Sequence, residues 1–412
     1  MTTLVRSGKE ANCLSLKEIL EAIRKASSHL DSYTVMIRRE LHMHPELSWE
    51  EEGTLSLIRR ELEASIKNSS LSFTVHEAAG GIWVDLTIDD FSPRILFRAD
   101  IDALPIQETN EFDYVSRVDG VMHACGHDCH TAMLLSAFKA IAQGWIAPKS
   151  NIRFVFQRAE EVGGQKSGGA LLVRDGVCDG INSAYGLHVG AKDALGVFFS
   201  KPGMMLCNPT IIEIEVGTTG GHVASPFLGT NAIDVMSSII TELRGIERLL
   251  FPPSEPLVFV PSVLKSGMAT NIRPNKAKIV FALRNFFTDE KKEKFINHVK
   301  MKVESIISSY VNTSLSLFEV TNGYPILIND PRSTRFVTNA LNTIGFAVEP
   351  DDLSFAGDDF AYYLQKVPGS YWVLGAWQEG CLDHHTAKFN PNEEALKHGV
   401  AFWLLLASRT PF

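Results

Sequence analysis

Apolar positions in the first 190 residues repeat at helical spacing at first and then in short continuous runs. Leu16, Ile19 and Ile23 share one face of a predicted amphipathic N-terminal helix. The continuous runs are rich in β-branched and aromatic residues, which is typical of buried strands. The predicted helices cover 14–41, 50–66, 131–142 and 168–175, and the predicted strands cover 81–87, 94–97, 152–157 and 183–189. This alternation predicts an α/β fold with a mostly parallel, doubly wound sheet.

From about residue 204 the pattern predicts a second, smaller unit. Residues 210–216 alternate between apolar and polar side chains, as expected for a strand that is buried on one face. The elements predicted after it are a helix at 231–250, strands at 257–264 and 277–284, a helix at 288–307 and a strand at 314–320. The order βαββαβ is that of a compact, ferredoxin-like α+β unit.

The α/β pattern returns after this unit and ends in an apolar helix at 394–408. We therefore expect one domain made of residues 1–203 and 320–412, and an inserted domain made of residues 204–319. A chain of 412 residues exceeds the size at which a single hydrophobic core keeps growing, which agrees with two domains.

Charge and composition exclude several classes of protein. The net charge of −9 gives no electrostatic reason to expect nucleic acid or an anionic membrane as a partner. No run of about eighteen apolar residues predicts a membrane span, and the first twenty residues lack the apolar core of a signal peptide. The cysteines are too scattered for a secreted disulfide framework, so we expect a cytoplasmic, reduced protein. They are Cys13, Cys125, Cys129, Cys178, Cys207 and Cys381.

The densest cluster of potential metal ligands is GVMHACGHDCHTAMLL, at 120–135. Thiolate, imidazole and carboxylate groups are the ligands that zinc and other transition metals prefer. Cys125 and His127 lie two residues apart before the predicted helix, so both can point the same way. Cys129 and His130 fall in the first helical turn and are expected to point elsewhere. The alternative is a capped helix that carries core histidines.

Further ligands are expected at the carboxyl ends of the predicted strands, where active sites of open α/β sheets collect. Glu160 and Glu161 follow the strand at 152–157, and His188 ends the strand at 183–189. The segment LDHHTAKF near the C-terminus contains His384 and His385. Two adjacent glutamates are also common on a solvated acidic surface, but a position just after a buried strand favours a site.

Five of these side chains are more than one tetrahedral zinc ion uses, and suit two metal ions that share a bridging ligand. Glu160 would then stay free to act as a general base towards a metal-activated water. The five candidate ligands are Cys125, His127, Glu161, His188 and His385.

Nine motifs, in order along nearly the whole chain, resemble the aminoacylase and carboxypeptidase clan of metallo-amidohydrolases. The resemblance is to the branch of hippurate hydrolases, auxin-conjugate (IAA-amino acid) hydrolases and N-acetyldiaminopimelate deacetylases. The motifs are RRELHMHPELSWEE (38–51), FRADIDALPIQE (97–108), MHACGHDCHTAMLL (122–135), AEE (159–161), GLHVG (186–190), GGHVASP (220–226), TNIRP (270–274), FAGDDFAYYL (355–364) and HHTAKF (384–389).

The resemblance implies a zinc-peptidase-like catalytic domain that binds two divalent ions, whether Zn, Mn, Co or Ni. Cys125 would bridge the two ions and Glu160 would be the general acid and base. Asp102, in the turn after a buried strand, matches a carboxylate that orients the site. A turn residue that satisfies backbone amides is the alternative for Asp102.

The resemblance also implies that the inserted domain serves as a lid and as the interface of a homodimer. His222 would stabilise the oxyanion, often across that interface, although a simple loop histidine is the alternative. Asn271 and Arg284 match residues that bind the α-carboxylate of a substrate, and an Arg fork suits a carboxylate. Both lie on neighbouring predicted strands of the inserted domain, so we expect the two side chains to converge.

Three residues depart from the family's pattern. Arg158 stands where proline is usual, Thr218 replaces a typical glycine, and Phe227 stands where histidine is common. None of them removes a proposed ligand or base, so activity should survive, and we expect any effect of the three residues to fall on the choice of substrate.

The sequence thus predicts a hydrolase that cleaves the amide bond of an N-acyl amino acid into an acyl product and an amino acid. A dipeptidase or carboxypeptidase acting on small peptides is the alternative within enzymes. A non-catalytic metal-binding protein on the same scaffold would be expected to lack Glu160 or a ligand, and this chain has lost neither. A structural zinc module would unfold on chelation rather than simply lose turnover.

Overall fold

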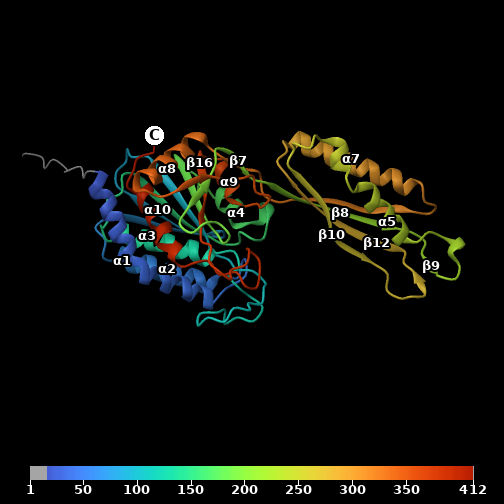
Figure 1. Cartoon of the computed structure of the whole chain (residues 1–412), viewed down its shortest axis with the longest axis horizontal. Coiled ribbons are helices and arrows are strands. Elements are labelled where there is room, and N and C mark those ends of the chain that lie inside the picture. Colours follow the sequence, from blue (N-terminus) through green and yellow to red (C-terminus); the bar gives the residue numbers. More distant parts are fainter. Residues whose placement is uncertain (1–15, 412) are drawn as a thin grey trace, which may run out of the picture.

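The computed structural model describes residues 16–411 and has two lobes, arranged end to end in an elongated molecule (Figure 1). Cys13 and Leu14, the latter the first residue of the predicted N-terminal helix, lie outside the described residues. An eight-stranded sheet forms the centre of the larger lobe, and a four-stranded sheet forms the smaller one. The chain enters the smaller lobe with β8 and leaves it with β13, so this lobe spans residues 208–322.

The sheet of the larger lobe confirms the α/β class, and its centre is parallel. Its strand order is β1-β2-β4-β3-β5-β16-β6-β15, and the pairs β4–β3, β3–β5 and β5–β16 are parallel. Antiparallel pairs on either side of this centre make the sheet mixed. The pair β1–β2 is antiparallel because a two-residue turn joins the two strands into a hairpin. The strands are β1 (Ser72–Ala78), β2 (Gly81–Thr87), β3 (Arg94–Asp100), β4 (Asn151–Gln157), β5 (Ser183–Gly190), β6 (Phe198–Ser200), β15 (Val348–Pro350) and β16 (Gly369–Gly375).

Helices cover both faces of this sheet. Phe97 and Phe154 pack into a core with the first group of helices, while Leu96 and Val155 point to the opposite face, because side chains alternate along a strand. The first group is α1 (Leu16–Met43), α2 (Glu52–Ile66), α3 (His127–Ala142), α8 (Pro331–Ile344) and α10 (Glu394–Ala407). The second face carries α4 (Gly168–Arg174) and α9 (Phe360–Leu364), with the short 3₁₀ helix η1 (Gly164–Lys166) just before α4.

The smaller lobe has the predicted order of elements and its own hydrophobic core. Its sheet is antiparallel throughout, in the ferredoxin-like order β10-β12-β8-β13. The predicted helix at 231–250 is broken at Gly245, whose φ of 83° lies in the left-handed region. The main elements are β8 (Asn208–Gly217), α5 (Ala232–Leu243), α6 (Ile246–Leu250), β10 (Leu257–Ser266), β12 (Lys276–Asn285), α7 (Asp289–Ser308) and β13 (Ser314–Asn322).

Short elements form the far tip of the smaller lobe and the crossing between the lobes. At the tip, β9 (Gly221–His222) pairs with β11 (Ile272–Arg273), next to the 3₁₀ helix η2 (Pro226–Leu228). At the crossing, β7 (Gly203–Leu206) pairs with β14 (Leu327–Asn329).

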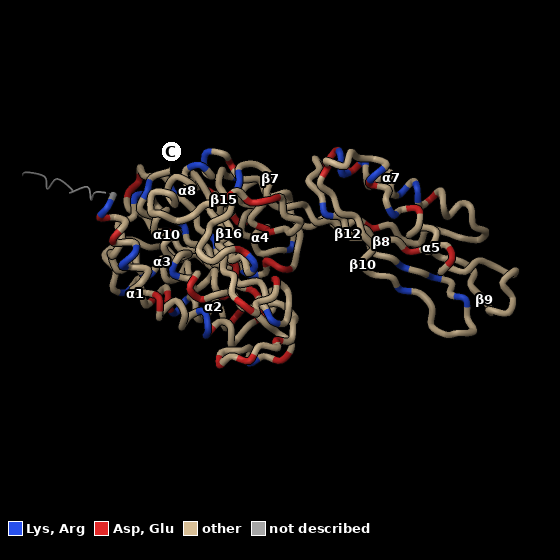
Figure 2. Tube along the Cα trace, viewed as in Figure 1, with Lys and Arg blue, Asp and Glu red and all other residues tan. Residues whose placement is uncertain are grey.

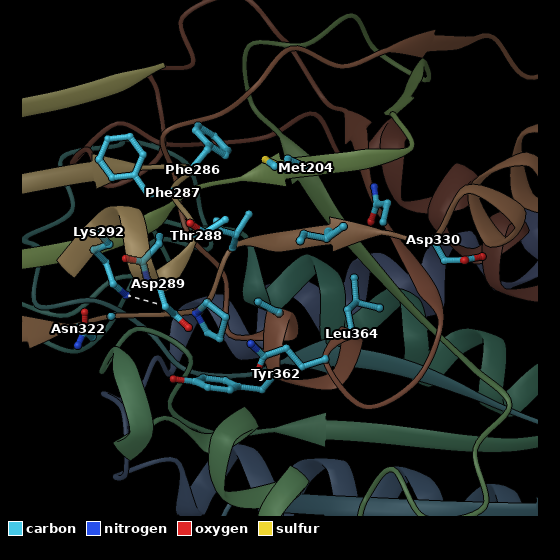
Figure 3. A pocket seen from close by; sticks show the side chains of 18 of the residues that line it. Met204, Phe286, Phe287, Thr288, Asp289, Lys292, Asn322, Asp330, Tyr362 and Leu364 are labelled. Carbon is cyan, nitrogen blue, oxygen red and sulfur yellow. Dashed lines mark ion pairs between the residues drawn. The ribbon is translucent and has the colours of Figure 1, made fainter. Parts of the chain in front are cut away.

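A groove of about 790 Å³ lies where the two lobes meet (Figure 3). The smaller lobe contributes Phe286 and Phe287 to its wall, and the larger lobe contributes Tyr362 and Leu364. Both lobes therefore shape this groove.

Charged residues of both signs are interspersed over the two lobes (Figure 2). Among the described residues, no helix combines the length and the apolar character needed to cross a bilayer.

Candidate metal centre

The five predicted ligands lie together at the carboxyl ends of the parallel strands. They form two groups that share Cys125, and within each group the ligand atoms lie within 4.8 Å of one another. His127 and His188 complete one group, and Glu161 and His385 complete the other. Segments of the chain that are up to 260 residues apart, from Cys125 to His385, thus meet at one place.

The loop before α3 positions two of these residues. The helix begins at His127, four residues earlier than the predicted Thr131, so that His127 stands in its first turn. Gly126 precedes the helix with a φ of 96°, and a Cβ there would lie 2.3 Å from a side-chain atom of Val189. Glycine is required at this position because both its backbone conformation and its close packing exclude a side chain.

Hydrogen bonds leave one ring nitrogen of His127 and one of His188 available to a metal. Nδ1 of His127 donates to the backbone carbonyl and the carboxylate of Asp102, at 2.9 and 3.1 Å. Its Nε2 is buried and has no hydrogen-bond partner. Nδ1 of His188 donates to the carbonyl of Val189 at 2.8 Å, and its Nε2 faces Sγ of Cys125 at 3.5 Å. These hydrogen bonds from Nδ1 fix the tautomer in which Nε2 carries the lone pair that a metal ion binds.

The two C-terminal histidines have different surroundings. Nε2 of His384 donates to the backbone carbonyl of Val189 at 2.9 Å, so this histidine supports the loop. His385 has a φ of 60°, and its Nε2 lies 3.1 Å from Oε1 of Glu161. Only His385 of the pair therefore reaches the cluster.

Two other histidines of the 120–135 segment do not belong to the two groups that share Cys125. Nδ1 of His130 donates to Asp100 at 2.6 Å, and its Nε2 accepts from the backbone N–H of Val189 at 2.9 Å. Burial lowers the pKa of His123 to about 4, and this buried histidine belongs to none of the groups of side chains whose ligand atoms converge. The interpretation as core histidines thus holds for His130 and His123.

Glu160 lies beside the ligands in a buried pocket rich in carboxylates. Its side chain accepts from the backbone N–H of Asp359 at 3.3 Å. Burial, together with the carboxylates of Asp358 and Glu161, raises the pKa of Glu160 well above its usual range. Burial and Glu161 likewise raise the pKa of the Cys125 thiol. Negative groups held together out of water favour bound cations, which agrees with a metal centre in this pocket.

Asp102 connects three parts of the centre. Besides His127, its carboxylate accepts from the hydroxyl of Ser48 at 2.7 Å and from the backbone N–H of Glu161 at 3.0 Å. Asp102 is fully buried and satisfies a backbone amide as well as a histidine. Asp102 therefore makes the contact to His127 that is expected of an orienting carboxylate, and also the contact to a backbone amide that is expected of a turn residue.

A buried ionic network below the ligands was not predicted from the sequence. Arg98 donates to Asp100 at 2.5 Å, to Asp359 at 2.6 Å and to Gln157 at 3.0 Å. Arg98 and Asp100 interrupt the apolar strand β3, and charged residues in a buried strand must be paired. That interruption was the signal that could have revealed the network.

The three predicted site residues of the smaller lobe are not brought together within one chain. His222 is in β9 and Asn271 directly precedes β11, both at the far tip (Figure 1). Arg284 stands opposite Pro209 at the other end of β12, close to the crossing between the lobes. Eight residues of extended strand span about 26 Å. The expectation that Asn271 and Arg284 converge was therefore wrong for a single chain.

The three departures from the family's pattern have different surroundings. Arg158 forms ion pairs with Glu51 and Glu52, at 2.8 and 3.0 Å. The backbone N–H of Thr218 donates to the carbonyl of Asn275. Phe227 is 81% exposed at the tip of the smaller lobe, so it packs against nothing that would explain it within this chain.

Comparisons with known proteins agree with this centre. The chain is 31% identical over 396 residues to thermostable carboxypeptidase 2 of Saccharolobus solfataricus, covering 95% of this chain and 98% of the relative. It is 32% identical over 386 residues to an N-acetyl-L-cysteine deacetylase of Bacillus subtilis, covering 93% and 89%. A crystal structure of the B. subtilis YxeP protein, described as a dinuclear metal-binding peptidase, superposes with a TM-score of 0.77 at 27% identity, covering 92% and 98%.

The sequence profile of peptidase family M20/M25/M40 matches residues 96–409, which is most of the chain and includes every candidate ligand. The smaller lobe lies inside this match, between two segments that contribute ligands. The resemblance found in the motifs is thereby confirmed, and this chain belongs to peptidase family M20/M25/M40.

Proposed function

We propose that this protein is a metal-dependent amidohydrolase that cleaves the amide bond of N-acyl amino acids into a carboxylic acid and a free amino acid. The observation that carries this proposal is the pair of ligand groups that share Cys125, directly beside the buried carboxyl group of Glu160. The deacetylase among the relatives supports an N-acyl amino acid as the substrate.

Two divalent ions fit the donor set of this centre. A mixture of thiolate, imidazole and carboxylate suits Zn, Mn, Co and Ni, and the lone-pair nitrogens of His127 and His188 are already oriented. The dinuclear centre of the B. subtilis structure supports the number of ions. When bound, such ions polarise a scissile carbonyl and make a water molecule more acidic. The residues that would hold them are Cys125 as the bridge, His127, Glu161, His188 and His385.

Glu160 is the proposed general base and general acid. Its carboxylate would take a proton from the attacking water and later give that proton to the nitrogen of the leaving amine. Asp102 would hold His127 and the backbone of Glu161 in place while this happens.

The smaller lobe would supply the groups that recognise the substrate. We assign the oxyanion contact to His222, and the contacts to the substrate's α-carboxylate to Asn271 and Arg284. His222 and Asn271 are on the far tip of their own chain, so in a homodimer they would act on the centre of the partner. The exposed outer edge of β10 supports such a dimer, since Val260, Val263 and Leu264 are exposed along it.

This proposal gives the two parts of the chain separate roles. The part predicted as residues 1–203 and 320–412 would form the catalytic, metal-binding domain. The part predicted as residues 204–319, whose lobe spans residues 208–322 in the structure, would form the lid and dimerisation domain. We also propose that the protein works in the cytoplasm. The five cysteines that the structure describes are all free, which supports a reducing compartment.

Glu160→Gln tests the mechanism. We expect kcat on N-acetyl amino acids to fall by about three orders of magnitude, because an amide cannot take the proton from water. Metal content, measured by mass spectrometry, should stay at the wild-type value because Glu160 is not a proposed ligand. Full activity of this variant would refute the assignment of Glu160.

A dipeptidase or carboxypeptidase activity is the second candidate, and the Saccharolobus carboxypeptidase among the relatives favours it. A peptide bond next to a free carboxylate is also an amide that this centre could cleave. The metal-loaded enzyme should be assayed on N-acetyl amino acids, on dipeptides, and on N-acetyl amino acid amides that lack the carboxylate. Higher kcat/KM on dipeptides would make the second candidate the main function.

A further inference from the structure

Arg158 stands directly before the turn at 159–161, and its side chain ties this turn to a distant part of the chain. Its Nε donates to Oε2 of Glu51 at 2.8 Å, and a terminal nitrogen donates to the backbone carbonyl of Trp49 at 2.8 Å. Its own backbone N–H donates to the carbonyl of Gly80 at 2.9 Å. Both the backbone and the side chain of Arg158 are therefore fixed.

Glu51 holds the same turn with its second oxygen. Oε1 accepts from the backbone N–H of Ala159 at 2.8 Å, and the carboxylate is fully buried. Glu51 directly precedes α2 but makes no side-chain capping bond to that helix. Its carboxylate is directed at the turn instead, where it contacts the side chain of Arg158 and the backbone of Ala159.

The turn needs such contacts because its backbone is in an uncommon conformation. Ala159 has a φ of 49°, in the left-handed region that residues with a Cβ seldom adopt. On the other side, the backbone N–H of Gly168 donates to the carbonyl of Ala159 at 3.1 Å. A Cβ at Gly168 would lie 1.8 Å from the carbonyl oxygen of Arg158, so helix α4 packs directly against the turn.

The next two residues along the chain carry the chemistry, so the position of this turn decides where both carboxylates point. Glu160 is the proposed base, and Glu161 is a proposed ligand whose backbone N–H also donates to Asp102. A proline, which the family resemblance predicts in place of Arg158, has neither an N–H nor a charged side chain and could make none of the contacts of Arg158.

We propose that Arg158 and Glu51 form a clamp that holds the turn at 159–161, and that Arg158 is a positioning residue for the reaction. This inference rests on the proposed function for the roles of Glu160 and Glu161, but the contacts of the clamp do not depend on those roles. Loss of the clamp lets both carboxylates shift, and a shift of about 1 Å at a reacting group can cost about a hundredfold in rate.

The test uses the full chain with Arg158→Ala, Arg158→Lys, Glu51→Gln and the double variant Arg158→Ala with Glu51→Gln. For Arg158→Ala we expect kcat to fall by about ten- to a hundredfold, with KM changed by less than about threefold. Arg158→Lys should recover part of the loss, because lysine keeps the charge. The double variant should be no slower than the slower single variant, since both substitutions remove the same clamp.

Two measurements that need no substrate accompany the kinetics. Amide hydrogen exchange in the segment 158–163 should become faster in Arg158→Ala. The affinity for added Mn²⁺ should fall as well, because Glu161 is a proposed metal ligand in this turn. The control is Arg59→Ala, which removes a similar but exposed Arg–Glu pair with Glu77 and should change none of these readouts.

Wild-type kcat and wild-type exchange in Arg158→Ala would overturn the proposal. A loss of kcat that Arg158→Lys does not recover, and that parallels a loss of thermal stability, would also overturn the proposal. The ion pair of Arg158 with Glu51 would then contribute to folding alone. If Arg158→Ala fails to fold, the near-isosteric Arg158→Lys and Glu51→Gln decide by the same criteria. If the wild-type protein is inactive on all N-acyl amino acids, the proposed function is refuted. Amide hydrogen exchange and Mn²⁺ affinity would still show whether Arg158 and Glu51 hold the turn.

Discussion

The hydrogen bonds of individual histidines decide which of them can bind a metal. His127 and His188 each use Nδ1 as a donor to an oxygen, so that Nε2 carries the lone pair, in the same group as Sγ of Cys125. His130 and His384 use Nε2 itself in a hydrogen bond to the backbone of Val189. Residue type alone does not separate these two pairs, but the partner of each nitrogen does.

The residue scale also predicts a dependence of stability on pH, through His42. Nδ1 of His42 lies 2.8 Å from Asp128, and its Nε2 lies 3.2 Å from Glu108. Burial by itself would lower the pKa of His42, but the hydrogen bonds to these two carboxylates outweigh it and raise the pKa above 6.5. The charged form of His42 is therefore more favourable in the folded protein than in the unfolded one.

A histidine whose pKa is higher in the folded protein than in the unfolded one stabilises the fold at pH values below its unfolded-state pKa of about 6.5. This stabilisation is lost as the pH rises through the folded-state pKa. We expect His42→Gln to lower the free energy of unfolding by about 3 kcal/mol at about pH 6, and by less at about pH 9. Urea denaturation at both pH values measures this difference. His44→Gln, in the exposed segment after α1, is the control, and a His42→Gln deficit that grows with pH would contradict the prediction.

At the scale of elements, the segment after β13 connects the smaller lobe to the catalytic turn. The hydroxyl of Tyr324 donates to the backbone carbonyl of Glu160 and accepts from the backbone N–H of Gly163 at 3.1 Å. The backbone carbonyl of Tyr324 accepts from the side chain of Asn208, at the beginning of β8. The second crossing thus contacts the loop that carries Glu160 directly, and the first crossing is connected to that loop through Tyr324.

We expect Tyr324→Phe to lower the free energy of unfolding by about 1–3 kcal/mol, because the carbonyl of Glu160 and the N–H of Gly163 lose a buried partner. Since this partner also holds the catalytic turn, kcat should fall by about tenfold. Thermal unfolding and steady-state kinetics measure the two effects. Tyr310→Phe, which removes a hydrogen bond to Ser238 in the smaller lobe, should lower stability without changing kcat. Unchanged kcat in Tyr324→Phe would show that the turn does not depend on this contact.

At the scale of the whole molecule, two features of the smaller lobe agree with a dimer. The residues proposed to act on the substrate, His222 and Asn271, lie on a tip that is far from their own metal centre (Figure 1). Strand β10 is at the edge of its sheet, with no further strand beside it among residues 16–411, and carries exposed apolar side chains. Exposed edges of this kind pair readily with another strand.

We expect light scattering to give about twice the chain mass of 45.5 kDa. Leu264→Lys, on the exposed edge of β10, should shift the protein to the monomer and strongly reduce activity. Mixing inactive His222→Ala chains with inactive Glu160→Gln chains should restore part of the activity, because a mixed dimer contains one centre with both groups intact. A wild-type monomer with full activity would contradict the dimer and the role of His222 across it.

The sequence by itself determined the α/β class, the order of the main elements in the smaller lobe and the five candidate ligands. These features depend on local patterns: apolar periodicity, motif order, and chemically reactive residues that directly follow buried strands. The weakly apolar edge strand β1 was not predicted, because it is half exposed and its side chains do not alternate clearly. The true start of α3 at His127 was missed as well, since the residues of its first turn look like loop residues.

Only the tertiary structure decided which ring nitrogen of each histidine carries the lone pair, and what Arg158 contacts. It also showed that Asn271 and Arg284 lie far apart in one chain, although their predicted strands are neighbours. The physical reason is the same in each case. Periodicity reports which face of an element is buried, whereas the partner of a polar atom depends on segments that are a hundred or more residues away.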